Sequence, residues 1–334
     1  MAEVPRLMRG RPRRGAAVPA AAPRTEAPRI QRLESNGLTW LHIESVTEAE
    51  TRALADEFGF HPLDLEDVLS RSRQRAKIDQ YDEYLFIVLH FPRYHKTSGR
   101  LQAIEVNLFV ADGLLITIPE EPLKPVSQLW TACVGSEQRR AELMSKGSGY
   151  LLYAIVDGIY DYCFPILDKI GFKLDSLEDA IFEGQREQVV RDLSSVTHEV
   201  VNYRKIVKPQ RGTLRLLERA TKRYATEDLE LYFDDIVDKS ERIWDGLENY
   251  KEVADALEAT NTSVITHRLN HLIRNLTVLS AVMLPLTLVT GFYGQNIDSL
   301  PLANHGVWSV LWTLALMVAV AAGLLGWFRH KRWI

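Results

Sequence analysis

The sequence contains little cysteine, and two long stretches near its C-terminal end contain no charge. Its 334 residues include only Cys133 and Cys163, which are too few and too isolated for a disulfide framework or a metal knuckle and suit a reducing cytoplasm. No Asp, Glu, Lys or Arg lies between Arg274 and Asp298, or between Asp298 and Arg329. A buried helical hairpin in a soluble core rarely runs this long without charge, so the two gaps predict membrane-spanning helices.

Motifs of common enzyme classes are also absent. The sequence has no phosphate-binding loop, no nucleophile elbow and no clustered zinc ligands, so an enzyme is not expected. Residues 1–30 are rich in Arg, Ala and Pro without the apolar stretch of a signal peptide, which predicts a disordered basic tail. This tail is expected either to touch anionic lipid or to be a plain flexible terminus, and no nucleic-acid partner is expected.

Both charge-free stretches are long enough to cross a bilayer. The first, Leu276 to Tyr293, has about 18 residues, and the second, 307–328, has about 22 residues or roughly 33 Å of helix. Basic residues precede the first span and follow the second in a tail at 329–334, whereas the loop at 294–306 has no Lys or Arg. Both chain ends are therefore expected on the cytoplasmic side of the cell membrane, with the loop outside.

The region before the spans changes from mixed to wholly helical character. Residues 31–148 predict a compact α+β cytoplasmic domain, with strands at Leu38–Ile43, Tyr84–His90, Leu101–Val110 and Leu114–Ile118 and a helix at Thr47–Phe58. Residues 149–226 predict long cytoplasmic helices, separated by a break at Pro209 and Gly212. No proline lies between Glu227 and Pro285, so residues 227–293 are expected to form one stalk and first transmembrane helix, on the order of 100 Å long.

The cytoplasmic part of this stalk is acidic. About a dozen Asp or Glu side chains lie between Glu227 and Glu258, against three basic residues. Such a run fits a solvated helix face, and it also fits a low-affinity site for hard divalent cations, which prefer carboxylate oxygen.

One face of the first span repeats at steps of three and four residues. An average step of about three and a half is typical of a helix that packs against copies of itself. The mixture of small, hydroxyl and leucine side chains fits either helix packing or a pore; because two helices per chain do not enclose a polar path, a pore requires an oligomer. This face, called the stripe below, comprises Asn270, Ile273, Leu276, Ser280, Leu284, Thr287, Gly291 and Gly294.

The end of the first span carries the most specific motif. The segment LPLTLVTGFYGQN, with its short loop, second span and basic C-terminus, resembles the CorA family of divalent cation transporters, in which a Gly-x-Asn motif closes the first of two spans. The segments FGFHPLDLEDVL, KIDQYDEYLFIVLH and LLYAIVDGIYDYCFPILDKI also resemble parts of this family, in the family's order. The resemblance covers most of the chain from about residue 35.

The resemblance implies a funnel-shaped homopentamer in which each subunit contributes an α+β domain, a stalk and two transmembrane helices. It implies uptake of Mg²⁺, with Co²⁺ or Ni²⁺ accepted, driven by the membrane potential through a pore with apolar constrictions at Leu276 and Leu284. Asn270 and Asn296 are the expected carboxamide ligands for the hydrated ion. The pore and selectivity positions that the resemblance and the stripe suggest are Asn270, Leu276, Ser280, Leu284, Thr287, Gly291, Gly294, Gln295 and Asn296.

Two departures from the family pattern affect the expected ion and its regulation. Gln295 stands where the best-known magnesium members have Met, so a zinc transporter of the ZntB-like branch, with proton coupling, is the alternative. Asp67 matches an acidic residue that pairs with a stalk Asp in magnesium-gated relatives, but the aligned stalk residue is Ala259. Asp67, Asp235 and Glu258 are the remaining metal candidates for regulatory Mg²⁺.

Two further interpretations of the sequence stay open. His267 and His271, four residues apart on one helix, fit either a Zn²⁺ or Co²⁺ site or contacts with lipid headgroups. A membrane-anchored sensor or scaffold, which binds divalent ions through its acidic cytoplasmic part without conducting them, is a third function for the chain.

Overall fold

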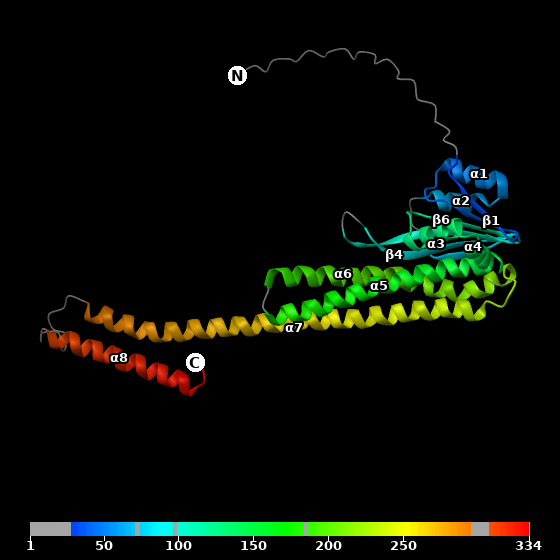
Figure 1. Ribbon diagram of the computed structural model, residues 1–334. Coiled ribbons are helices and arrows are strands. Elements are labelled where there is room, and N and C mark those ends of the chain that lie inside the picture. The colour runs from blue at the N-terminus through cyan, green and yellow to red at the C-terminus, as the bar shows by residue number, and fades with distance from the viewer. Residues whose placement is uncertain (1–27, 71–73, 96–98, 184–185, 295–306, 334) are drawn as a thin grey trace, which may run out of the picture. The chain divides into compact units, whose positions relative to one another are not determined.

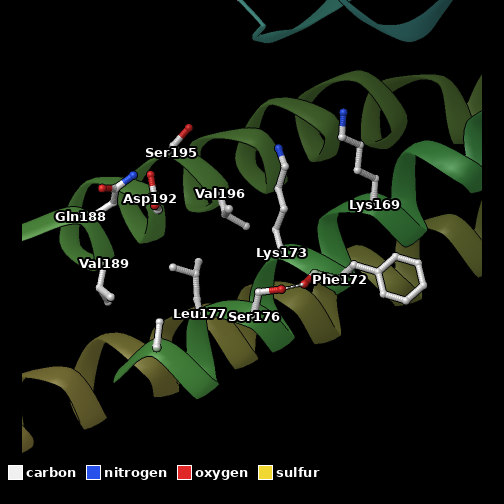
Figure 2. Close-up of a pocket in the computed structure, with 11 residues that line it drawn as sticks. Lys169, Phe172, Lys173, Ser176, Leu177, Gln188, Val189, Asp192, Ser195 and Val196 are labelled. Atoms are coloured by element: carbon white, nitrogen blue, oxygen red, sulfur yellow. Dashed lines mark hydrogen bonds between the residues drawn. The ribbon is translucent and has the colours of Figure 1, made fainter. Parts of the chain in front are cut away.

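The structure is a computed structural model that describes residues 28–70, 74–95, 99–183, 186–294 and 307–333 (Figure 1). These residues divide into two compact units. The sheet unit contains residues up to 94, 102–163 and 206–241, and the helical unit contains residues 95–101, 164–205 and those from 242 onward. Most of the predicted basic tail, residues 1–27, lies outside the described residues.

The sheet unit is built on six strands in the order β1-β2-β6-β5-β4-β3. Strands β2 and β6 are parallel, whereas β1–β2, β3–β4 and β5–β6 are antiparallel pairs. Asn36 and Gly37, with φ of 52° and 75°, join the first two strands through the left-handed backbone that a tight hairpin requires. The strands are β1 Gln31–Ser35, β2 Leu38–His42, β3 Lys77–Gln80, β4 Tyr84–Tyr94, β5 Leu101–Ala111 and β6 Leu114–Pro119.

Helices cover both faces of this sheet because successive strand residues point to opposite sides. On one side Leu41 packs in a buried cluster with Leu54 of α1 (Glu48–Phe58) and Leu65 of α2 (Pro62–Leu69). On the other side the neighbouring Trp40 packs edge-on against Trp130 of α3 (Lys124–Gly135), with ring centroids 4.8 Å apart. The short α4, Glu137–Met144, follows α3 (Figure 1).

Four of the strands and the first helix were predicted from the sequence, and the structure confirms them. The break predicted near Pro209 is wrong, because α6 runs without interruption over Arg186–Thr221. Pro209 lacks an N–H and so leaves one carbonyl of the preceding turn without its bond, but the flanking residues hold the helix in place. Gln210 is buried and accepts a hydrogen bond from the His90 backbone N–H at 3.0 Å, and Thr213 donates to the carbonyl of Ala76 at 3.1 Å.

The remaining helices are long. Helix α5 spans Ser148–Glu183, α7 spans Glu230–Tyr293 and α8 spans Val307–His330, and the 64 residues of α7 continue through Pro285 as predicted. Three helices are long and apolar enough to cross a membrane, but the apolar window of α5 is 50% buried, whereas the windows of α7 and α8 are 6% and 0% buried. We therefore interpret α5 as a core helix and the ends of α7 and α8 as the membrane spans.

Candidate functional site

The last third of α7 has two contrasting faces. With about 100° between successive residues, the stripe from Ile273 to Gly294 lies within about 40° of a single line along the helix. Val278, on the opposite side, is only 8% exposed, whereas Leu276 and Leu284 on the stripe are 64% and 75% exposed. Asn270 is also exposed but lies about 80° from that line. Within one chain the stripe thus lies on the uncovered side of this helix, which also includes Leu279 and Leu288.

Hydroxyl groups on this helix are satisfied by its own backbone. Thr287 Oγ donates to the carbonyl of Met283 at 2.6 Å, one turn before it, and Thr277 donates to Ile273 at 2.7 Å in the same way. Because the hydroxyl proton of Thr287 is used inside the helix, the lone pairs of its oxygen remain available outward to a cation or to the water that surrounds one.

A glycine, Gly294, directly follows the last residue of α7. The backbone N–H of Gly294 donates to the carbonyl of Thr290 at 2.8 Å, and a Cβ on Gly294 would lie 2.9 Å from that same oxygen. Any larger residue there would push the last turn open. Gln295 and Asn296, which complete the predicted selectivity motif, lie outside the described residues.

The predicted metal candidate Asp67 contacts a lysine. Lys77 Nζ lies 2.8 Å from Asp67 Oδ2 and 2.5 Å from Asp79 Oδ2. Burial lowers the pKa of Lys77, but its bonds to Asp67 and Asp79 outweigh that effect and raise the pKa above its ordinary value. One ammonium is therefore shared by Asp67 and Asp79 within the same chain.

A second lysine lies close to Asp235. Lys239 Nζ lies 2.5 Å from Asp157, 2.7 Å from Asp161 and 3.4 Å from Asp235, so one ammonium bridges carboxylates of α5 and α7. Burial raises the pKa of Asp157 more than Lys239 lowers it. Burial together with Asp157 and Asp235 raises the pKa of nearby Tyr153 to about 12.

Most of the other acidic side chains of α7 are exposed, Glu241 is half-buried, and several have basic partners. Glu258 is exposed, Glu248 pairs with Arg204 of α6 at 2.9 Å, and Glu241 pairs with Arg215 at 2.8 Å. Among the described residues, no group of three or more His, Cys, Asp or Glu side chains is arranged to hold a metal ion. The predicted metal residues Asn270, Asp67, Asp235 and Glu258 are thus not brought together as one site within a single chain.

The histidine pair is also engaged by an arginine. The rings of His267 and His271 lie 4.7 Å apart, and Arg274 Nη2 is 2.8 Å from Nδ1 of His271. A guanidinium has no acceptor, so this Nδ1 is the acceptor and its lone pair is taken. That arrangement disfavours metal binding through Nδ1 of His271. The two rings lie about 140–180° from the stripe, on the other side of α7.

Two lysines that contact the acidic candidates Asp67 and Asp235 were not predicted from the sequence. Lys239 follows Asp235 by four residues, a spacing that places the two side chains together on one helix and was available as a signal. Lys77, ten residues from Asp67, reaches it only through the tertiary fold, which no periodicity reveals.

A long helix that leads from an acidic half into a charge-free stretch, followed by a second apolar helix, is the architecture of a membrane protein. Residues 35–331 match the family described as CorA-like Mg²⁺ transporter protein. The chain belongs to that family, and it is a CorA-family divalent metal ion transporter. This family comprises membrane ion transporters rather than enzymes.

The individual relatives differ in the ion that they are named for. The chain is 27% identical over 305 residues to the cobalt/magnesium transport protein CorA of Thermotoga maritima, covering 90% of this chain and 85% of that protein. It is 21% identical over 295 residues to the zinc transport protein ZntB of Pectobacterium atrosepticum, covering 88% of each. Magnesium and zinc are therefore both represented among its relatives.

Solved structures have the same fold. The CorA magnesium transporter from Methanocaldococcus jannaschii superposes with a TM-score of 0.78 at 22% identity, covering 90% of this chain and 93% of that one. The full-length CmaX protein gives 0.70 at 22% identity, covering 89% of each chain. The expected combination of an α+β domain, a long helix and helices able to cross a membrane is confirmed at this level.

Proposed function

We propose that five copies of this chain surround one pore lined by the stripe of α7, and that the pore conducts Mg²⁺, with Co²⁺ and Ni²⁺ as further substrates, into the cytoplasm. The observation that carries the proposal is the contrast along α7 between the covered face at Val278 and the uncovered stripe. Polar side chains at heptad-like spacing, here Asn270, Ser280 and Thr287, are expected where helices surround a shared aqueous axis. They are not expected on a surface that faces lipid.

The stripe is suited to a hydrated cation. Mg²⁺ releases its water reluctantly, so rings of neutral oxygens from Asn270, Thr287 and Asn296 hold the hydrated ion without trapping it. Five copies of Leu276 and of Leu284 form apolar constrictions that close the path when water leaves them. A potential of 100 mV, negative inside, contributes about 4.6 kcal/mol for two charges, which drives uptake without ATP.

The acidic stalk supports this function by attracting cations, not by holding one at a metal site. Lys77 contacts Asp67, and Lys239 lies 3.4 Å from Asp235, so a regulatory Mg²⁺ would compete with an ammonium at either residue. Asp67 also lacks an acidic counterpart at the aligned stalk position, which is Ala259, with Glu258 beside it. We propose that closure by cytoplasmic Mg²⁺ is weaker in this protein than in magnesium-gated members of the family.

Liposomes that contain the purified protein test the pore. We expect Mg²⁺ uptake down an imposed potential, abolished by Asn296→Ala and strongly reduced by Asn270→Ala. Asn275→Ala is the matched control, since Asn275 is an exposed asparagine about 140° from the stripe, and we expect it to transport like the native protein. Equal uptake by the Asn270 and Asn275 variants, or no flux from intact pentamers, would refute the proposal.

The same liposomes decide between the two ions. The ZntB-like relative makes Zn²⁺ uptake, coupled to protons, the second candidate. With Mg²⁺, Co²⁺, Ni²⁺ and Zn²⁺ in competition, we expect excess Mg²⁺ to suppress Co²⁺ uptake and a pH gradient to have no effect. Suppression by Zn²⁺ alone, together with proton movement, would favour the second candidate.

A further inference from the structure

The C-terminal end of α8 is a tightly built turn rather than a frayed one. Trp333 N–H donates to the carbonyl of Phe328 at 2.9 Å, and Arg332 N–H donates to Arg329 at 3.1 Å. Arg332 has φ of +57°, in the left-handed region that favours glycine. These two bonds and the left-handed residue form a Schellman motif, in which the side chains of Phe328 and Trp333 are expected to touch.

The expected contact is present. The rings of Phe328 and Trp333 have centroids 5.7 Å apart, and those of Trp327 and Phe328 are 5.1 Å apart. Phe328 is buried at 4% exposure. The motif therefore fixes the direction of the chain where the second span ends, although the left-handed position holds an arginine instead of the usual glycine.

The turn presents three basic side chains to solvent. Arg329, Lys331 and Arg332 are all exposed, and within the described part of the chain no carboxylate pairs with any of them. Arg268 and Arg274 lie just before the first span. In the orientation of the proposed function, on which this inference rests, both groups lie at the inner surface of the membrane.

No acidic side chain lies close to these five charges along the chain. The sequence contains no Asp or Glu between Glu258 and Asp298, and none after Asp298. Glu258 is ten residues, or about 15 Å along the helix, below Arg268. In a pentamer the charges repeat around the axis, so their mutual repulsion requires counterions, and the anions at this level are phospholipid headgroups.

We infer that the Schellman turn of α8 is a binding site for the headgroup of an anionic phospholipid. Arg329, Lys331 and Arg332 contact the phosphate region, and the exposed rings of Trp327 and Trp333 lie at the acyl boundary, where aromatic side chains with polar edges are favoured. The arginine at the left-handed position adds a charge to this group where glycine would add none.

A lipid-binding measurement tests the inference without requiring transport. The full-length protein in detergent micelles is titrated with fluorescent phosphatidylglycerol and, in parallel, with fluorescent phosphatidylcholine of the same acyl chains. We expect a preference for phosphatidylglycerol that falls on the order of tenfold or more in the triple variant R329Q/K331Q/R332Q, because each basic residue near a surface contributes measurably to anionic binding.

Matched variants separate specific binding from general charge. R191Q/K205Q/K222Q removes three exposed basic residues elsewhere in the cytoplasmic part and is expected to bind as the native protein does. R332G keeps the left-handed turn and is expected to give an intermediate loss, which keeps the test valid if the triple variant fails to fold. Equal loss in the control triple variant, or no preference between the two lipids, would overturn the inference.

Two further results distinguish the lipid site from a site for free phosphate and from the pore. Inorganic phosphate at millimolar concentration is expected not to displace the lipid probe, and full displacement would assign the site to free phosphate instead. Native protein that selects phosphatidylglycerol but conducts no ion would support the lipid site and refute the pore. Conduction without any lipid preference would do the reverse.

Discussion

The hydroxyl of Tyr250 on α7 lies 2.5 Å from the position that a Cβ on Gly171 of α5 would occupy. The contact has a counterpart within the helical unit, because a Cβ on Gly246 of α7 would meet Leu167 of α5 at 3.0 Å. Each helix thus has a glycine where the other places a large side chain. Within the helical unit, the absence of a side chain at these two positions sets how closely α5 and α7 approach.

Replacing Gly171 with valine is expected to destabilise the protein by about 1–3 kcal/mol, since the new side chain must displace Tyr250 or separate the helices. Gly212→Ala is the matched control, because nothing lies within 4 Å of a Cβ at that helical glycine. That control is expected to be neutral or to stabilise by up to about 1 kcal/mol through helix propensity. Thermal unfolding of the two variants measures the difference, and equal melting temperatures would contradict the packing argument.

Removing the ammonium of Lys239 is expected to destabilise the sheet unit. In Lys239→Met, Asp157, Asp161 and Asp235 lose their shared cation, and the expected cost is about 1–3 kcal/mol, between a surface and a buried pair. Lys251→Met removes a pair with Asp255 on the exposed surface of the same helix and is expected to cost less than about 1 kcal/mol. Denaturant unfolding at pH 7 checks both values.

The pH dependence of the Lys239 variant has a definite sign. Burial already raises the pKa of Asp157, and loss of the lysine raises it further. A folded-state pKa above the unfolded value means that the folded state holds the proton more tightly, so its stability falls as the pH rises through that range. Lowering the pH from 7 to 5 is therefore expected to recover part of the loss in Lys239→Met, and a loss independent of pH would contradict the charge argument.

Glu105 is expected to make the sheet unit sensitive to acid. Burial raises its pKa, but bonds from His90, Asn107 and the backbone N–H of Gln74 outweigh burial and leave the pKa below its ordinary value. A depressed folded-state pKa stabilises the protein above about pH 4.3, the ordinary value, and this contribution is lost as the pH falls through the folded-state pKa.

Glu105→Gln is expected to remove that acid-sensitive contribution. The amide also replaces a carboxylate that accepts several bonds, so a loss of about 1–3 kcal/mol at pH 7 is expected. Glu121→Gln is the control, because Glu121 is half-exposed and pairs with Arg93 at the surface. Unfolding followed by tryptophan fluorescence between pH 3 and 7 measures both, and parallel curves for native protein and Glu105→Gln would show that Glu105 is not the titrating group.

The sequence predicted those parts of the fold that follow from local hydrophobic pattern. The runs at β4 and β5 are long and apolar because these strands lie inside the sheet, whereas β1 and β3 lie at its edges and have the mixed sequences QRLES and KIDQ. Pro209 was interpreted as a break because proline removes a helical hydrogen bond. The tertiary contacts that keep α6 continuous there do not show in the local sequence. The stripe could be drawn from spacing alone, but the contact of Lys77 with Asp67 depends on which strand passes beside α2.

The stripe itself leads to a prediction about gating. Leu284→Ser places a hydroxyl at one of the two proposed constrictions, so water is retained there and Mg²⁺ flux at rest is expected to rise severalfold. Leu279→Ser is the matched control: it makes the same change at a leucine that is 59% exposed, against 75% for Leu284, but about 100° from the central line of the stripe on α7. Uptake into liposomes at low imposed potential compares the two. If the control raised flux as much as Leu284→Ser, the stripe would not face the pore, and the proposed oligomer would have to present another side of α7 to its axis.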